Sequence, residues 1–135
     1  MITAKIAYLG ELRTKATHLQ SGNEIITDAP TDNHGKGEAF SPTDLVATAL
    51  GACMISIMAI KLLGTDKDIK GATIESTKVM YSEPRRIGEI HIKINVPDQG
   101  FSDKEKQILI NAAHACPVAK SLHPDIKQIV EINFN

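Results

Sequence analysis

Two cysteines, Cys53 and Cys116, are the clearest candidate nucleophiles in the sequence. A thiolate attacks peroxides and disulfides, and two thiols that meet can form a disulfide. Cys53 lies within the apolar stretch SPTDLVATALGACMIS, and Cys116 lies in AAHACPVAK, directly before Pro117. If the two segments pack side by side, the sulfurs could meet. Free cysteines are also common as buried packing residues, so the alternative is two unrelated core thiols.

A cation near one thiol would favour its reactive form. An unperturbed cysteine is only a few per cent thiolate near neutral pH, and a guanidinium group within reach raises that fraction. Arg13 is the candidate, although one arginine on a strand could equally face solvent. A metal site built from Cys53, His114 and Cys116 is disfavoured, because His-x-Cys is not a common zinc spacing and a fourth ligand is missing.

Length and composition limit the classes of protein to consider. A chain of 135 residues predicts one domain, residues 1–135, and its net charge of -1 argues against a nucleic-acid-binding surface. The most apolar run, Leu45 to Ile60, is short for a membrane span and suits a core helix. No targeting segment is evident at the N-terminus, so we expect a soluble cytoplasmic protein in which the cysteines are reduced or redox-active.

Alternation and turn signals predict the elements that would position these residues. Residues 3–9 and 12–18 alternate around Gly10-Glu11, and a third strand over residues 24–27 follows Ser21-Gly22-Asn23, which predicts an antiparallel meander. Residues 28–40 form the longest expected loop. Further strands are predicted at residues 72–82, 86–96 and 126–134.

The helix that carries Cys53 has clear signals at both ends. Ser41 is the expected N-cap, Pro42 fits the first helical position, and Asp44 favours the positive end of the helix dipole. Gly64 is the expected terminator. Because the helix is apolar on nearly every side, we expect it to be buried between other elements. The small residues Gly51 and Ala52 indicate that another helix or a substrate approaches it closely.

The second half of the chain completes the predicted fold. Ser102-x-x-Glu105 is a capping box before a helix at residues 103–115, and a short helix is expected over Val118 to Leu122. Strands followed by a helix, strands, helices and a final strand predict an α+β fold, with the helices packed on an antiparallel sheet.

The whole chain resembles the OsmC/Ohr superfamily of thiol-dependent hydroperoxide reductases and their relatives. The resemblance rests on the order of the elements, on the SPTDLVATALGAC helix, on the ACP step at Cys116 and on the separation of the two cysteines. It implies that Cys53 is the peroxidatic and Cys116 the resolving cysteine. A family arginine nine residues before a turn glycine falls on Arg13, counted back from Gly22. The implied architecture is an intertwined homodimer with central helices and active sites at the subunit interface.

One position departs from the family pattern. Active members usually carry a glutamate ten residues before the first cysteine, paired with the arginine, and that position is Thr43 here. Asp44 is turned by about 100° around the helix and is better explained as a helix-start carboxylate. Glu38 or Glu11 could supply the carboxylate instead. The sequence is therefore more similar to the less characterised OsmC-like branch than to Ohr itself.

The resemblance predicts a function in oxidative stress defence. Cys53 would reduce an organic hydroperoxide, Cys116 would form a disulfide with it, and an external dithiol, lipoyl-type or other, would restore both. No cofactor or metal is expected. The alternatives are a non-enzymatic OsmC-like protein that binds a small apolar ligand or senses oxidants, and a plain structural thiol pair. His18 and His114 could also line the site.

Overall fold

The structure is a computed structural model that describes residues 1–135, and it consists of two compact units. The first unit is Met1–Val46 and the second is Ala47–Asn135, so the boundary falls within the first helix, α1 (Pro42–Ile60). The grouping of residues 1–135 into a single domain stays a prediction.

The first unit is built on a three-stranded antiparallel meander, as predicted. Its strands are β1 (Ala4–Gly10), β2 (Arg13–His18) and β3 (Glu24–Asp28), in the order β1-β2-β3. The register places Arg13 opposite Asp28 and Thr14 opposite Thr27. Because side chains alternate along a strand, Arg13 and Asp28 share one face of the sheet. The following loop contains one short 3₁₀ helix, η1 (Thr31–Asn33).

The opposite face of this sheet is apolar and open within the chain. Ile6, Ala16 and Ile25 lie side by side across the three strands, next to Tyr8. The exposed fractions of Ile6, Tyr8 and Ile25 are 66%, 66% and 47%. Three strands without a covering layer bury little apolar surface, so this sheet needs further packing for independent stability.

Reciprocal hydrogen bonds start α1, as the sequence predicted. The backbone N–H of Asp44 donates to Ser41 Oγ at 3.0 Å, and the backbone N–H of Ser41 donates to Asp44 Oδ2 at 2.9 Å. Two of the N–H groups that a helix start leaves unpaired are thereby satisfied. Asp44 is therefore a helix-start carboxylate.

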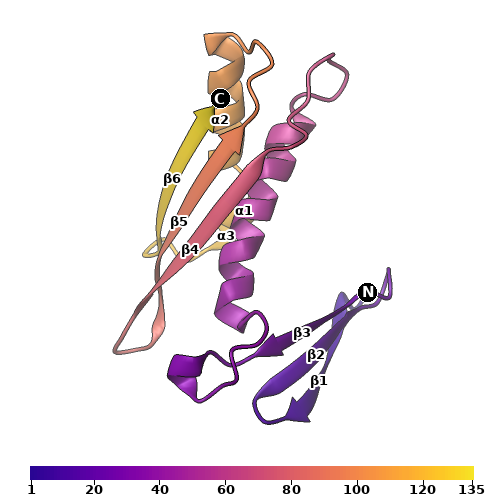
Figure 1. The fold of residues 1–135 in the computed structure, drawn as a ribbon, viewed down its shortest axis with the longest axis vertical. Coiled ribbons are helices and arrows are strands. Elements are labelled where there is room, and N and C mark those ends of the chain that lie inside the picture. The colour runs from indigo at the N-terminus through magenta and orange to yellow at the C-terminus, as the bar shows by residue number, and fades with distance from the viewer. The chain divides into compact units, whose positions relative to one another are not determined.

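The second unit contains a sheet of β4 (Thr73–Tyr81), β5 (Arg86–Val96) and β6 (Lys127–Phe134), with β5 in the middle (Figure 1). β4 and β5 are antiparallel, whereas β6 runs parallel to β5. The α+β class is confirmed, but the expectation of a purely antiparallel sheet is wrong for this last pair. A parallel neighbour requires a crossover, which α2 (Asp103–His114) and α3 (Pro117–Ser121) provide.

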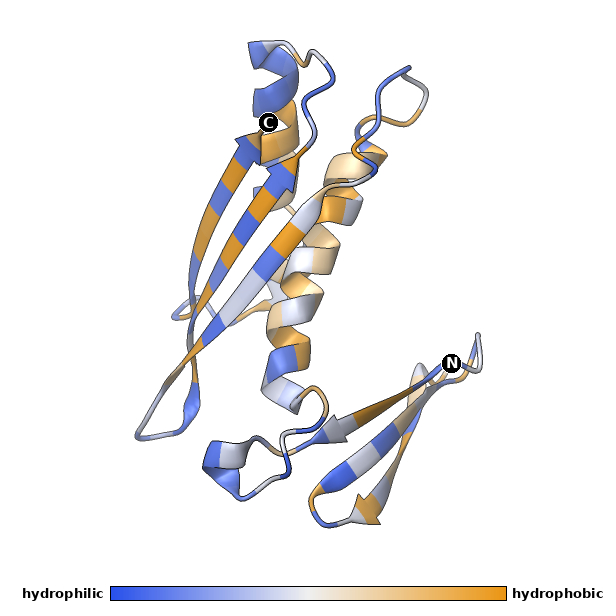
Figure 2. Cartoon of the chain, in the orientation of Figure 1, coloured by the Kyte–Doolittle hydropathy of each residue, from blue (hydrophilic) through white to orange (hydrophobic).

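The core of this unit lies between the sheet and the helices. Hydropathy alternates along β5 (Figure 2), and its apolar residues Ile90, Ile92, Ile94 and Val96 are all buried. From α1, the buried large side chains are Leu50, Met54 and Met58. Leu109, Ala112 and Ala113 are the buried residues of α2.

Gly51 lets α1 lie close to the sheet. A Cβ atom at this position would come within 2.9 Å of Ile74 Cγ2 on β4 and 3.6 Å of Ile92 Cδ1 on β5. At Gly51, the close approach predicted from the small residues beside Cys53 is made by side chains of the sheet. This contact fixes the height of α1 above the strands.

Only one side of α1 is buried within the chain. Ala52, Ser56 and Ala59 are exposed, and Ile60 at its end is 54% exposed. The prediction that this helix is covered on nearly every side therefore does not hold for the single chain. α1 is long and apolar enough to cross a membrane, but the core helices of soluble proteins can have the same length and composition.

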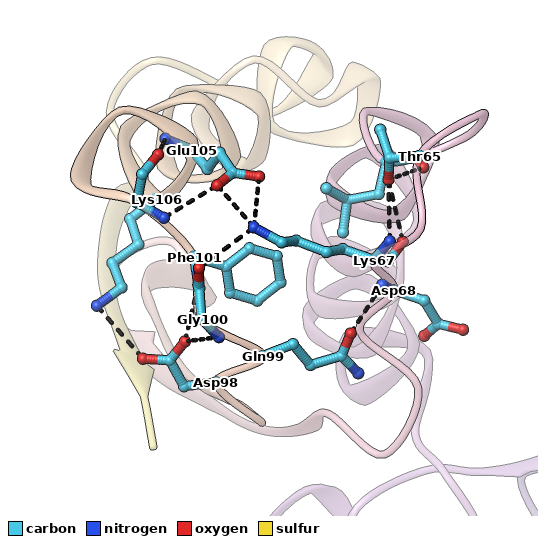
Figure 3. A network of polar contacts seen from close by, with 11 residues as sticks. Thr65, Lys67, Asp68, Asp98, Gln99, Gly100, Phe101, Glu105 and Lys106 are labelled. Carbon is cyan, nitrogen blue, oxygen red and sulfur yellow. Dashed lines mark hydrogen bonds and ion pairs between the residues drawn. The ribbon is translucent and has the colours of Figure 1, made fainter.

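The predicted capping box of α2 is present and is tied to the loop after α1. Ser102 Oγ accepts from the Glu105 N–H, and Glu105 Oε1 accepts from the Ser102 N–H at 3.0 Å. The same carboxylate binds Lys67 Nζ at 2.9 and 3.1 Å (Figure 3). The Ser102 and Lys67 hydrogen bonds lower the pKa of Glu105 to about 2.

The lysine of this pair also reaches the loop before α2. Lys67 Nζ donates to the Gly100 carbonyl at 3.2 Å and lies 5.5 Å from the centre of the Phe101 ring (Figure 3). Phe101 in turn packs edge-on against Phe134 of β6. These contacts join the loop after α1, the start of α2 and β6.

Candidate active site: a thiol pair and an arginine clamp

Cys53 and Cys116 meet in the second unit, as the sequence predicted for segments that pack side by side. Both are free thiols, and they lie close enough for Cys53 to raise the pKa of Cys116. Cys53 lies in α1 at the border of its buried side and is half-buried, whereas Cys116 is fully buried. A molecule arriving from solvent therefore reaches Cys53 and not Cys116.

Cys116 is held in place by the start of α3. It is the N-cap residue of this helix, and its Sγ accepts a hydrogen bond from the Ala119 N–H at 3.3 Å. Burial raises the pKa of the Cys116 thiol, and contact with Cys53 raises it further, against the opposing effect of the Ala119 hydrogen bond. Cys116 is accordingly a protonated thiol in the resting protein, next to a more accessible partner.

Arg13 belongs to the first unit, where two carboxylates bind it. Its Nε donates to Asp28 Oδ1 at 2.7 Å and its Nη2 to Asp28 Oδ2 at 2.8 Å, a bidentate pair. Nη2 also donates to Glu38 Oε1 at 3.1 Å. Hydrogen bonds from Arg13 hold the pKa of Asp28 below its ordinary value although burial opposes this, and Asp28 in turn raises the pKa of Arg13.

Asp28 is the partner of Arg13 that sequence reasoning missed. The sequence predicts that the third strand ends at Thr27, which leaves Asp28 in the following loop, whereas β3 includes Asp28. Extending that strand by one residue around the turn at Gly22 would have placed Asp28 opposite Arg13. Glu38 reaches Arg13, as was suggested for it, whereas Glu11 is engaged elsewhere with Lys36 Nζ at 2.7 Å.

Thr43, at the position of the family glutamate, lies at the start of α1, and its possible supporting role stays a prediction. Its hydroxyl lies 3.2 Å from Ser41 Oγ in the first turn of α1. Of the two histidines that were expected near the site, His18 has its Nδ1 2.6 Å from Ser21 Oγ in the β2–β3 turn, and His114 is exposed at the end of α2. No group of three or more His, Cys, Asp or Glu side chains is arranged to hold a metal ion.

A cavity of about 410 Å³ lies beside the C-terminal half of α1, within the second unit. It is lined mainly by apolar residues of α1 and of the loop after it, among them Ile55, Ala59, Leu63 and Ile69. Cys53 is not among its lining residues. The cavity is therefore separate from the thiol pair.

Comparisons with known proteins give a family match and a similar crystal structure. The model of the family described as OsmC-like protein matches residues 35–131. A crystal structure of a candidate osmotic stress induced and detoxification response protein from Psychrobacter arcticus 273-4 is 58% identical, with a TM-score of 0.92 over 98% of this chain and 96% of that one. No curated protein sequence matches the chain.

More distant solved structures share the fold. An organic hydroperoxide resistance protein OsmC from Legionella pneumophila has a TM-score of 0.75 at 16% identity, over 98% of both chains. A protein from Vibrio cholerae O1, described as a candidate organic hydroperoxide resistance protein, has a TM-score of 0.73 at 16% identity, over 98% of this chain and 92% of that one. With the family match over most of the sequence and a relative at 58% identity, the chain belongs to the OsmC-like protein family.

Proposed function

We propose that this protein is a thiol-dependent peroxidase that reduces organic hydroperoxides in oxidative stress defence. The observation that carries the proposal is the contact between two free thiols of unequal exposure, a half-buried Cys53 and a fully buried Cys116. A peroxidase of this kind needs one thiol that meets the oxidant and a second that waits beside it.

The reaction is a sequence of three exchanges. The Cys53 thiolate attacks the distal peroxide oxygen, so an S–O bond forms, the O–O bond breaks, and the alkoxide leaves with a proton as the alcohol. Cys53 is now a sulfenic acid. Cys116 then attacks the Cys53 sulfur, the S–S bond forms and water leaves. An external dithiol, lipoyl-type or other, reduces the disulfide and is itself oxidised to a disulfide.

Arg13 has the supporting role in this proposal. A fixed guanidinium favours the thiolate over the thiol and offers hydrogen bonds to the peroxide oxygens. Its bidentate pair with Asp28 in the first unit keeps its direction defined. The preference for an organic hydroperoxide draws on the names of the Legionella and Vibrio structures that share the fold.

Oxidation of the thiol pair tests the proposal directly. With one equivalent of cumene hydroperoxide, the wild-type protein is expected to lose both titratable thiols and to form an intramolecular Cys53–Cys116 disulfide, because the second thiol already contacts the first. Peptide mapping with mass spectrometry under non-reducing conditions measures this. Recovery of both free thiols after exposure, or over-oxidation of Cys53 without a disulfide, would contradict it.

The second candidate function is binding of a small apolar ligand without catalysis. The cavity of about 410 Å³ lies within the usual size range of ligand pockets, and its walls are mainly apolar. In this alternative Cys53 senses oxidants or only packs. The rate of Cys53 alkylation against pH distinguishes ligand binding from peroxidase activity, because a thiol pKa of about 8.5 or above favours binding over catalysis.

We also propose that the protein acts as a homodimer. The apolar face formed by Ile6, Tyr8 and Ile25 and the open side of α1 are the surfaces that a second copy would bury. Cytoplasmic location and the absence of nucleic-acid and membrane partners stay predictions.

Sedimentation equilibrium is expected to give twice the chain mass of 14.6 kDa, and the melting temperature should rise with protein concentration. Ile25→Lys, which places a charge on the apolar face, should shift the equilibrium toward monomer. Asp125→Asn changes the net charge equally at an exposed loop position and should leave the mass unchanged. A monomer at all concentrations, or equal masses for both variants, would exclude this interface.

A further inference from the structure

The two carboxylates that bind Arg13 differ in how firmly they are held. Asp28 makes two short charge-assisted hydrogen bonds to Arg13, at 2.7 and 2.8 Å, and its side chain is fully buried. Glu38 makes one longer bond, at 3.1 Å, and its side chain is 66% exposed. Exposed ion pairs of the second type contribute little and exchange readily with solvent.

Asp28 is further fixed by its own backbone surroundings. Its Oδ2 accepts a second hydrogen bond, from the Glu38 N–H at 3.1 Å, and its backbone N–H donates to the Phe40 carbonyl at 3.0 Å. Both carboxylate oxygens are thus occupied, and the carboxylate cannot turn away from Arg13 without leaving buried groups unpaired. The carboxylate of Glu38 has Arg13 as its partner and can leave without such a penalty.

Part of the guanidinium is available for a ligand. A guanidinium has five N–H donors, of which Asp28 takes two and Glu38 takes one. These bonds use Nε and Nη2, which leaves the two N–H groups of Nη1 for a ligand. A ligand oxygen could therefore bind at Nη1 and, if Glu38 moved away, bridge to Nη2.

We propose that Asp28 is the positioning residue for Arg13 and that Glu38 is an exchangeable carboxylate, which leaves Nη2 when the oxygens of the hydroperoxide bind there. This inference rests on the proposed function, because it assigns the exchange to that substrate. It gives the two carboxylates opposite kinetic roles. Asp28 maintains the geometry of the guanidinium, whereas Glu38 competes with the substrate for it.

NMR of the arginine side chains tests the positions of the two carboxylates without reference to activity. The chain has three arginines, Arg13, Arg85 and Arg86, so the Nε–H signals can be assigned with an Arg13→Lys variant. The Arg13 signal should be sharp and slow to exchange with solvent in the wild type and in Glu38→Gln. In Asp28→Asn it should broaden or exchange rapidly. An unchanged signal in folded Asp28→Asn would overturn the role of Asp28.

Kinetics with cumene hydroperoxide and a dithiol tests the exchange. Asp28→Asn should lower kcat/KM by up to roughly a hundredfold, the effect of a misplaced group at a reacting centre. Glu38→Gln should lower KM by up to about fivefold with kcat unchanged, because a weaker competitor is easier to displace. A merely structural role of Glu38 would not lower KM, so an unchanged or raised KM overturns its assignment as a competitor.

The two failures can be told apart. If the wild type shows the protected Arg13 signal but does not consume hydroperoxide, the proposed function is wrong while the positioning by Asp28 stands. If the wild type is active but Asp28→Asn keeps both the signal and the activity, the present inference is wrong. If Asp28→Asn does not fold, the KM of Glu38→Gln still tests the role of Glu38. The solvent exchange of the wild-type Arg13 signal still tests whether Arg13 is firmly held.

Discussion

Cys53→Ser protein is expected to lose hydroperoxide turnover by on the order of a thousandfold or more, because a serine hydroxyl barely ionises near neutral pH and is a far weaker nucleophile. The loss should be in kcat/KM, since no intermediate can form without the sulfur. Consumption of cumene hydroperoxide with a dithiol in excess measures it. Thr48→Ser, a small change at an exposed position of the same helix, is the matched control and should retain wild-type turnover.

Cys116→Ser should give a different result from Cys53→Ser. Without the resolving thiol, Cys53 should still reduce one equivalent of hydroperoxide and then remain as a sulfenic acid, which a dimedone label traps. The label should be absent from Cys53→Ser and weak in the wild type, where the adjacent Cys116 removes the intermediate. Equal turnover by wild type and Cys53→Ser would rule out the peroxidase proposal.

Gly51→Val is expected to destabilise the protein by about 1–3 kcal/mol, the usual cost of overpacking a filled core. Even a Cβ atom here would approach Ile74 Cγ2 to 2.9 Å, and a branched side chain requires more room. The helix would have to lift from β4 and β5, and Cys53 would move with it. Urea unfolding at fixed protein concentration measures the change in the free energy of unfolding.

A double-mutant cycle identifies the contact as the cause. Ile74→Ala removes the methyl group that a side chain at position 51 would meet, so Gly51→Val should cost less in that background. The same cycle should restore the rate of Cys53–Cys116 disulfide formation. If the cost of Gly51→Val is equal in both backgrounds, the close approach of α1 to the sheet does not set its position.

Those parts of the fold that local patterns determine could be predicted from the sequence. β5 has the predicted bounds, residues 86–96, because alternating isoleucines specify both a strand and its buried face. α2 starts at Asp103 because the Ser102–Glu105 capping box specifies the start of a helix. The local patterns placed Cys53 on a helix and Cys116 near a helix end, and the pairing of the two was implied by the family resemblance.

What could not be predicted depends on contacts between distant segments. The direction of β6 was missed because the alternation of a single strand carries no information on which way it runs beside its neighbour. Asp28 was missed because an acidic residue at a strand end has the same local signal as a loop residue. The open side of α1 was missed because apolar composition shows a need for burial but not which chain supplies the cover.

The parallel pairing of β6 with β5 makes the chain unequally tolerant of insertions. The connection between the two strands must return along the whole sheet, and Cys116 lies part-way along it, between α2 and α3. An extra residue between His114 and Cys116 would shift the sulfur away from Cys53. An extra residue in the exposed segment at Pro124 and Asp125, beyond α3, would only lengthen a surface loop. Variation in loop length among related chains should therefore concentrate after Leu122, and not in the segment just before Cys116.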